Sequence, residues 1–341
     1  MSEKNSKSTH FDVLKVITTV LVVFAHASRM YTGEGVVTPS LESPVLNYIT
    51  KFIYAFHMPL FIGISGMVYG YCVDDLGKYN NTIDFLLNKG KRLLIPYLVF
   101  GLAYVAPVMV FFHFTDSSYI KYCIGGLFFV QNSRHLWYII VLFEIFFVCA
   151  FLRKLLLKKN LILEILVIIL LFGISFFSGH LTGKFAIATF ANYLIYFYLG
   201  FLFNRYYDRI VKIIKNPITI VLMVIAYIFL LEYSFKAITI LNSILGSCIL
   251  IGVTSYFPES FMKKKQIAKA NKNGFGIYLF HPMIIYVLFY YFGPKQIHPM
   301  ILCFGITIFA YIASWLLTDL IRILKLSIII GESKKAKKRK E

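Results

Sequence analysis

Long apolar stretches, separated by short polar ones, follow one another along most of this chain. Hydrocarbon about 30 Å thick is crossed by roughly 20 apolar residues in a helix, and polar flanks mark ten stretches that approach this length. The pattern predicts an all-α polytopic membrane protein with about ten transmembrane helices in one bundle. The predicted spans are residues 11–31, 49–72, 92–112, 135–152, 161–178, 190–204, 217–233, 237–257, 274–292 and 299–326.

These spans differ in how evenly their apolar residues are spread. Those at 161–178, 217–233 and 237–257 show little asymmetry between helix faces, which indicates contact with lipid around much of the circumference. Five other spans are interrupted by polar or ionisable side chains and are the informative ones for function. They are 11–31, 49–72, 92–112, 135–152 and 274–292.

Composition agrees with this pattern. Of the 341 residues, 59% are hydrophobic and 15% are charged, and the mean hydropathy is +0.73. These values lie outside the range of soluble globular proteins. The net charge of +19 suggests nucleic acid at first, but the basic residues are not gathered on a polar module with a recognisable reading motif. We therefore expect no nucleic-acid partner.

The basic residues are distributed unevenly between the two sides of the membrane. With the amino terminus inside, 27 of the 35 lysines and arginines fall in cytoplasmic segments. Because cytoplasmic loops carry the excess of lysine and arginine, we expect both termini to be cytoplasmic. No connection is long enough for a separate soluble domain. The chain is therefore divided into a membrane domain, 1–331, and a basic cytoplasmic tail, 332–341, drawn to anionic membrane lipids.

Several familiar chemistries leave no signature in the sequence. The five cysteines form no CxxC pair, which indicates neither a disulfide framework nor a metal site. A GxSxG elbow, a Walker loop and an HExxH motif are also missing, so soluble-hydrolase, ATPase and zincin mechanisms are excluded. A histidine-based acid/base reaction remains open.

The first span carries two ionisable side chains, Lys15 and His26. An ionisable group in hydrocarbon costs a few kcal/mol or more unless it faces protein or water, so it indicates a functional site. The two residues are eleven positions apart, about 16 Å of helix and close to three turns, and therefore share one face. The alternative is a snorkelling lysine and a histidine that bonds a backbone carbonyl.

The second span contains FHMPLFIGISG, with His57 at a depth similar to that of His26. Two imidazoles at one depth on adjacent helices are expected to face each other across a cavity. Gly63, Ser65 and Gly66 thin the same helix, which favours close backbone approach or a polar lining. A kinked helix with only a packing role is the alternative.

The third and fourth spans add one cation and one carboxylate. Arg92 lies at the inner boundary, one turn before Pro96, where its guanidinium can hold a phosphate in a bidentate fork; a helix-flanking anchor is the alternative. Glu144 lies a third to a half of the way across the membrane without a neighbouring charge in sequence. We expect it to pair with Lys15, with Arg92 or with a protonated histidine.

Aromatic and imidazole side chains begin the fourth span and recur in the ninth. His135, Trp137 and Tyr138 suit an interfacial aromatic belt, while His135 and Trp137 are also candidates for binding a sugar substrate. In the ninth span, GIYLFHPM places His281 within hydrocarbon depth, next to Pro282.

Five motifs occur together in a fixed order. A basic residue, ten intervening residues and a histidine (Lys15 and His26) come first, followed by PLFIGISG, RLLIP, HLWYI and IYLFHP. In order and spacing they resemble acyltransferase family 3, the bacterial integral-membrane O-acyltransferases, and in particular its fucose 4-O-acetylase-like and exopolysaccharide acetylases. The resemblance covers the chain from about Phe11 to Leu326.

This resemblance implies an enzyme that transfers an acyl group, usually acetyl. The donor would be cytoplasmic acetyl-CoA, a co-substrate rather than a permanently bound cofactor. The acceptor would be a hydroxyl of a cell-envelope polysaccharide or its lipid-linked precursor, at the bacterial cytoplasmic membrane. The family's first-span histidine maps onto His26 and its third-span arginine onto Arg92. Its first-span arginine is replaced by Lys15, which keeps the charge but lacks the planar fork.

A division of roles follows as a hypothesis. Lys15 and Arg92 hold the CoA phosphates, and His26 is the general base, since an unperturbed imidazole titrates near pH 6.5. Glu144 or His57 orients the base or relays its proton. Direct transfer and an acyl-histidine intermediate both remain open, and no metal is expected.

Two other functions are considered as alternatives to acyl transfer. An exporter or proton-coupled transporter of a glycan would also use intramembrane histidine and glutamate, and release of free CoA by the purified protein separates enzyme from carrier. A membrane scaffold without chemistry does not explain ionisable residues in at least four spans. The acceptor sugar depends on the outer loops, about 32–48 and 113–134, which contain no decipherable code.

Overall fold

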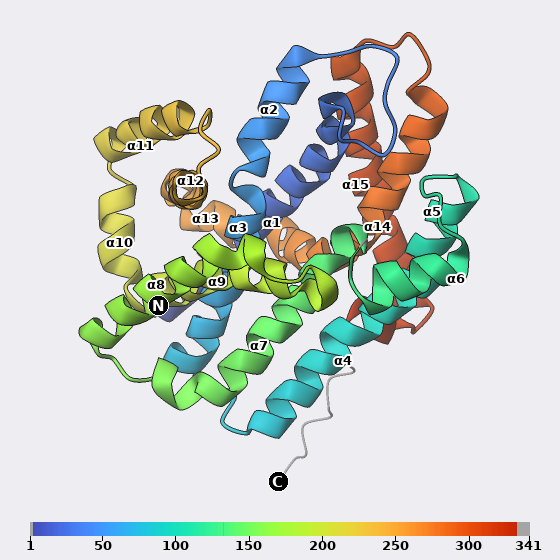
Figure 1. Ribbon diagram of the computed structural model, residues 1–341. Helices are drawn as coiled ribbons and strands as arrows, with labels where there is room; N and C mark the ends of the chain where they lie inside the picture. The colour runs from blue at the N-terminus through green and yellow to red at the C-terminus, as the bar shows by residue number, and fades with distance from the viewer. Residues whose placement is uncertain (1–2, 132, 333–341) are drawn as a thin grey trace.

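The computed structural model describes residues 3–131 and 133–332. It is a bundle of helices, and no strand occurs in these two ranges (Figure 1). The helices are α1 (Glu3–Ser28), α2 (Pro44–Tyr54), α3 (His57–Gly70), α4 (Thr82–Phe100), α5 (Ala106–Phe111), α6 (Tyr119–Tyr122), α7 (Trp137–Leu156), α8 (Leu161–Phe176), α9 (Ile187–Arg205), α10 (Tyr207–Ile214), α11 (Pro217–Leu230), α12 (Lys236–Thr254), α13 (Glu259–Met262), α14 (Lys265–Phe292) and α15 (Pro299–Ile323).

The polytopic all-α prediction is confirmed, with a smaller number of clear spans. Within the described residues, eight helical segments are long and apolar enough to cross a membrane, or nine if the bent pair α10 and α11, at 76°, forms one span. The remaining predicted span, 135–152, corresponds to α7, which carries Glu144, Arg153 and Lys154. Of the predicted basic tail, residues 333–341 lie outside the described residues.

Two connections that the charge pattern assigns to the outer side meet at one end of the bundle. There the backbone N–H of Ser40 donates to the carbonyl of Gly293 at 2.9 Å, which joins the α1–α2 and α14–α15 connections (top of Figure 1). At the other end Arg153 donates to Asn80 at 2.6 Å and joins two predicted inner connections. These two contacts agree with the sides that the charge pattern assigns to the four connections they join.

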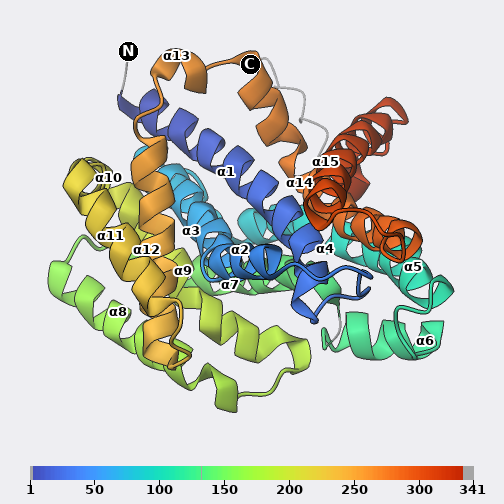
Figure 2. The ribbon, with the colours of Figure 1, turned by 90° about the horizontal axis from the view of Figure 1, so that it is seen from above.

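Three of the five polar predicted spans, the first, second and ninth, lie deepest in the bundle. α1 runs between α3 on one side and α14 and α15 on the other (Figure 2). In the most apolar stretch of α14, 61% of residues are buried, against 22% in that of α8. This contrast agrees with the lipid contact expected for 161–178 and with the functional interest of the first, second and ninth spans.

Glycines let α3 and α9 touch through their backbones. A Cβ atom on Gly66 would lie 2.0 Å from the carbonyl oxygen of Phe197, and one on Gly200 would lie 1.9 Å from that of Gly63. Small residues permit such an approach between membrane helices. The close approach predicted for the GISG stretch is thus directed at α9, while Ser65 faces the opposite side of α3 and bonds α7.

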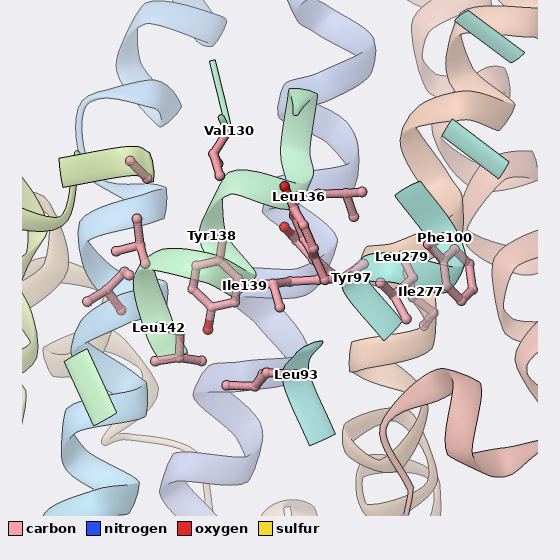
Figure 3. Close-up of a cluster of buried hydrophobic side chains, with 14 of the residues drawn as sticks. Leu93, Tyr97, Phe100, Val130, Leu136, Tyr138, Ile139, Leu142, Ile277 and Leu279 are labelled. Atoms are coloured by element: carbon pink, nitrogen blue, oxygen red, sulfur yellow. The ribbon is translucent and has the colours of Figure 1, made fainter. Parts of the chain in front are cut away.

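An apolar cluster fixes α4, α7 and α14 relative to one another. Figure 3 shows side chains of these three helices meeting inside the bundle, where they are buried. The labelled members from these helices are Leu93, Tyr97, Phe100, Tyr138, Ile139, Leu142, Ile277 and Leu279. This packing holds the candidate site residues described next in fixed positions.

Candidate active site

A cavity of about 180 Å³ lies between α1, α3, α4, α7 and α14. Lys15 of α1 and Lys89 and Arg92 of α4 line it, and Ser65 and Tyr138 line it as well. A second hollow, which shares Lys15 and Arg92, extends from it toward the segment that follows α15. The structure therefore brings the two predicted cations together at one cavity.

The three cations are held in different ways. Lys15 pairs with Asp12 at 3.5 Å, and the ammonium of Lys89 lies 3.9 Å from the centre of the Phe146 ring. Arg92 is exposed, and its guanidinium forms no hydrogen bond or ion pair with any residue that the structure describes. It is thus free to bind an anion. Nothing in the sequence KGKR distinguishes Lys89 from Lys91, so only the structure places Lys89 at the cavity.

The second hollow, which we call the entrance of the cavity, has a wall beside Arg92 that a proline and a glycine shape. Pro96 lies inside α4, and a proline in a helix leaves the carbonyl four residues earlier without its usual donor. This is the carbonyl of Arg92. Gly331 packs directly on it, because a Cβ atom there would lie 2.4 Å from that oxygen, and its φ is +72°. The segment after α15 therefore forms a wall of the entrance.

Three imidazoles from three elements meet deeper in the bundle. The rings of His26 and His281 pack edge to face with centroids 5.0 Å apart, and those of His281 and His135 are 6.1 Å apart. His281 bonds the carbonyl of Ile277 through Nδ1 at 2.9 Å, which leaves its Nε2 buried without a partner. His135 uses Nε2 toward Leu279 at 3.2 Å and leaves Nδ1 unpartnered.

The hydrogen bonds of His281 and His135 to backbone carbonyls determine which ring nitrogen of each can accept a proton. A ring nitrogen that bonds a carbonyl carries the hydrogen, so in a neutral imidazole the other nitrogen is an acceptor. His281 and His135 therefore each present a free lone pair inside the bundle. His26 is only partly buried and forms no hydrogen bond with the described residues. Such an arrangement can accept and pass on a proton.

Tyrosine rings connect the basic cavity to the histidines. Tyr138, at the cavity wall, bonds Ser65 at 3.1 Å and packs against Tyr278 with centroids 5.3 Å apart. Tyr278 donates to the backbone carbonyl of His135 and lies 6.3 Å from the His281 ring. The interfacial position predicted for Tyr138 is wrong: it is 4% exposed and lies in the core, because its ring lies on the inward face of α7 (Figure 3).

The rings of His57 and His26 make no direct contact in the described residues. His57 begins α3, bonds the carbonyl of Ile53 through Nδ1 at 2.9 Å, and packs against Tyr54 with centroids 4.6 Å apart. His281 takes the position against His26 instead, since α14 contacts α1 along its length. The depth of a histidine along its helix does not say which neighbouring helix supplies the ring that packs on His26.

Glu144 is also not paired as expected. Its carboxylate forms no ion pair or hydrogen bond among residues 3–131 and 133–332, and its Oε2 is buried without a partner. It lies on the side of α7 that also carries the exposed Phe147 and Phe151, away from the buried face with Tyr138. The structure does not bring it to the histidines.

The two predicted sugar-binding residues are separated. Trp137 stacks near Tyr193, with centroids 5.0 Å apart, and lines an open depression together with Asn192 and Lys236. His135, at 4% exposure, belongs instead to the buried histidine group. No cluster of three or more possible metal ligands occurs in the described parts of the chain.

Comparison with known proteins agrees with this membrane architecture. A family model described as an acyltransferase domain matches residues 9–319. This chain belongs to acyltransferase family 3. The family covers every element that carries the cations and histidines described above.

Two similar proteins have names that include a polysaccharide. The chain is 24% identical over 304 residues to a "Probable poly-beta-1,6-N-acetyl-D-glucosamine export protein" of Staphylococcus aureus, which covers 82% of both chains. It is 24% identical over 305 residues to a protein of the same name from Staphylococcus epidermidis, with 82% of this chain and 81% of the relative covered. No solved structure matches this family member.

Proposed function

We propose that this protein moves an acyl group, acetyl in the first instance, from cytoplasmic acyl-CoA to a hydroxyl of a cell-envelope polysaccharide or its lipid-linked precursor. It would act in the bacterial cytoplasmic membrane with both termini inside. The observation that carries the proposal is a cavity with three cations, whose tyrosine wall leads to the His26–His281 pair. Membership of the acyltransferase family and the polysaccharide in the relatives' names support it.

The cavity suits the two ends of an acyl-CoA. Its nucleotide is anionic, and Lys15, Lys89 and Arg92 supply the complementary charge. The unpaired guanidinium of Arg92 can bind a phosphate through two parallel bonds. The mostly uncharged arm that carries the thioester would then extend along the cavity toward Tyr138.

His26 would supply the base. As the acceptor hydroxyl attacks the thioester carbon, its proton passes to an imidazole nitrogen of His26. A new C–O bond forms, the C–S bond breaks, and CoA leaves as a thiolate that takes up the proton. His281, whose unpartnered Nε2 lies in the same group, would stabilise the protonated ring. In the alternative with an acyl-histidine intermediate, His26 would instead be the nucleophile: its ring nitrogen would bond the acyl carbon as the C–S bond breaks and CoA leaves, and the acceptor oxygen would then take the acyl group and release the imidazole.

The proposal is tested with the purified protein in nanodiscs and labelled acetyl-CoA. We expect release of free CoA that depends on an added envelope glycan, and label that appears on the glycan. Mass analysis of the glycan from cells with and without the gene should show the same acyl group. Intact acetyl-CoA in the first assay, together with identical glycans in the second, would rule the proposal out.

Export is the second candidate, because the relatives are named as export proteins. It predicts that glycan crosses the membrane of a proteoliposome without any consumption of acyl-CoA. Measuring saccharide movement and CoA release in one preparation distinguishes the two functions.

A further inference from the structure

A second polar region lies on the other side of α3, between α2, α9 and α12. It is a pocket of about 460 Å³. Its lining includes Tyr54, Asn192, Tyr193, Lys236 and Asn242. The open depression beside Trp137 shares Asn192, Tyr193 and Lys236 with it. The two hollows therefore form one continuous polar region, which we call the outer groove.

One buried polar atom in the outer groove lacks a partner. Asn242 is only 3% exposed, and its Oδ1 has no hydrogen-bond donor among the described residues. Leaving a buried polar group unbonded costs about 1–3 kcal/mol, so such an atom indicates a missing ligand. The hydroxyl of Tyr54 lines the same pocket beside the guanidinium of Arg29. An unmet acceptor in a polar pocket matches a hydroxyl or amide donor of a saccharide.

The outer groove also holds an uncompensated positive charge. Lys51 is paired with Glu232 at 2.8 Å. Lys236 instead donates to the amide oxygen of Asn192 at 2.7 Å and has no ion pair in the described ranges. An ammonium group without a counter-ion at the edge of a membrane protein is suited to a phosphate.

An apolar groove continues from this polar region. It has a volume of about 320 Å³, lies between α3, α8, α9 and α12, and shares Pro59 and Tyr196 with the polar pocket. Gly63 and Gly200, which touch through their backbones, line this groove. Because they have no side chains, they do not fill it. Glu164 also lines it. The groove can hold a flexible hydrocarbon chain.

From this juxtaposition we infer that the acceptor is a lipid-linked saccharide. Its lipid tail lies in the apolar groove, its phosphate lies at Lys236, and its sugar lies against Tyr54, Asn242 and Trp137. The inference rests on the proposed function and names the acceptor for it. Tyr54 packs on His57 and lies 5.4 Å from the guanidinium of Arg29, three residues after His26. A sugar in the groove is therefore on the side of the bundle that approaches the base.

The test measures binding to the protein in nanodiscs by native mass spectrometry. The probe is undecaprenyl diphosphate that carries one N-acetylglucosamine. Phosphatidylglycerol and a lipid-free N-acetylglucosamine pentasaccharide are the comparison ligands. We expect the probe to bind at least about tenfold more tightly than either one, because only the probe fills both parts of the site.

Matched variants locate the site. Ile165→Trp fills the apolar groove, whereas Ile169→Trp changes an exposed residue on the same helix outside it. We expect only the first to weaken probe binding. Lys236→Gln removes a charge-assisted bond to phosphate and should weaken binding about tenfold. Its control, Lys295→Gln, changes a lysine over Phe292 and should have no effect.

Three results would overturn the inference. They are equal binding of phosphatidylglycerol and the probe, equal binding of the pentasaccharide and the probe, or unchanged probe binding by Ile165→Trp. Failure of the proposed function gives a different result, namely no CoA release by the wild type with any acceptor. CoA release with the pentasaccharide alone, unaffected by Ile165→Trp, keeps the transferase and rejects the lipid-linked acceptor.

Discussion

Two clusters of buried polar residues in this protein differ in how many of their polar atoms have hydrogen-bond partners. Around Arg205, at the end of α9, the guanidinium contacts Asp74 at 2.9 Å, Glu164 at 2.5 Å and the carbonyl of Leu156 at 2.8 Å. Tyr206 donates to the second oxygen of Glu164 at 2.6 Å. Neither Arg205 nor Glu164 has an unpartnered buried atom. This group ties α7, α8 and α9 to the helical turn Tyr71–Asp75 that follows α3.

The histidine group is the opposite case. His135 and His281 each keep one buried nitrogen without a partner, and His26 has no hydrogen bond in the described parts of the chain. A buried charge with every partner in place holds helices together, whereas free lone pairs are available for a substrate proton. On this difference we assign the first group a structural role and propose the histidine group for chemistry, although both consist in the sequence of ionisable residues in or near predicted spans.

His26→Ala gives the largest expected effect on chemistry. Removal of a general base should lower acyl transfer by about 10²–10⁴-fold, with an unchanged amount of folded protein, as judged by gel filtration and thermal unfolding. CoA release is the measurement. His180→Ala, at an exposed position, is the control and should keep full activity. Normal turnover by His26→Ala would end the assignment of this imidazole.

Arg205→Ala should do the reverse. Loss of the cation leaves Asp74 and Glu164 buried without compensation, and breaking such a group costs roughly 3–5 kcal/mol. We expect a lower unfolding temperature and a lower yield, while turnover per folded molecule is kept. Arg209→Ala, one helical turn further on and exposed, should leave the unfolding temperature unchanged. A stable but inactive Arg205→Ala protein would contradict the structural role.

Arg92→Gln tests the entrance. Loss of a charge-assisted bond to phosphate should raise KM for acetyl-CoA about tenfold with little change in kcat. Lys91→Gln is the matched control, because Lys91 is exposed and does not line the cavity. Steady-state CoA release over a range of donor concentrations gives both constants. A fall in kcat at constant KM would place Arg92 outside donor binding.

Glu144→Gln should have the smallest effect. Its carboxylate has no partner and lies away from the buried face of α7, so we expect a change of less than about twofold in turnover, close to the range of neutral substitutions. CoA release at saturating donor is again the measurement. A loss comparable to that of His26→Ala would show that Glu144 belongs with the histidines after all.

Much of the site could be predicted because helix geometry is local. Lys15 and Arg92 were predicted as two cations near the inner boundary, and the structure places both at one cavity. The partners across helices could not be predicted. His281 rather than His57 lies against His26, and Tyr138 lies in the core rather than at the interface. Rotation of a helix about its own axis decides such contacts, and depth does not constrain it.

Length, hydropathy and charge in the sequence determined that this chain is a helical membrane protein, roughly where its spans begin and end, and that the span 161–178 lies at the periphery. These properties follow from the cost of placing polar groups in hydrocarbon, which each segment meets by itself. Only the tertiary structure decided which polar groups are satisfied and which are left free, because a hydrogen-bond partner for one helix is supplied by another through side-chain packing.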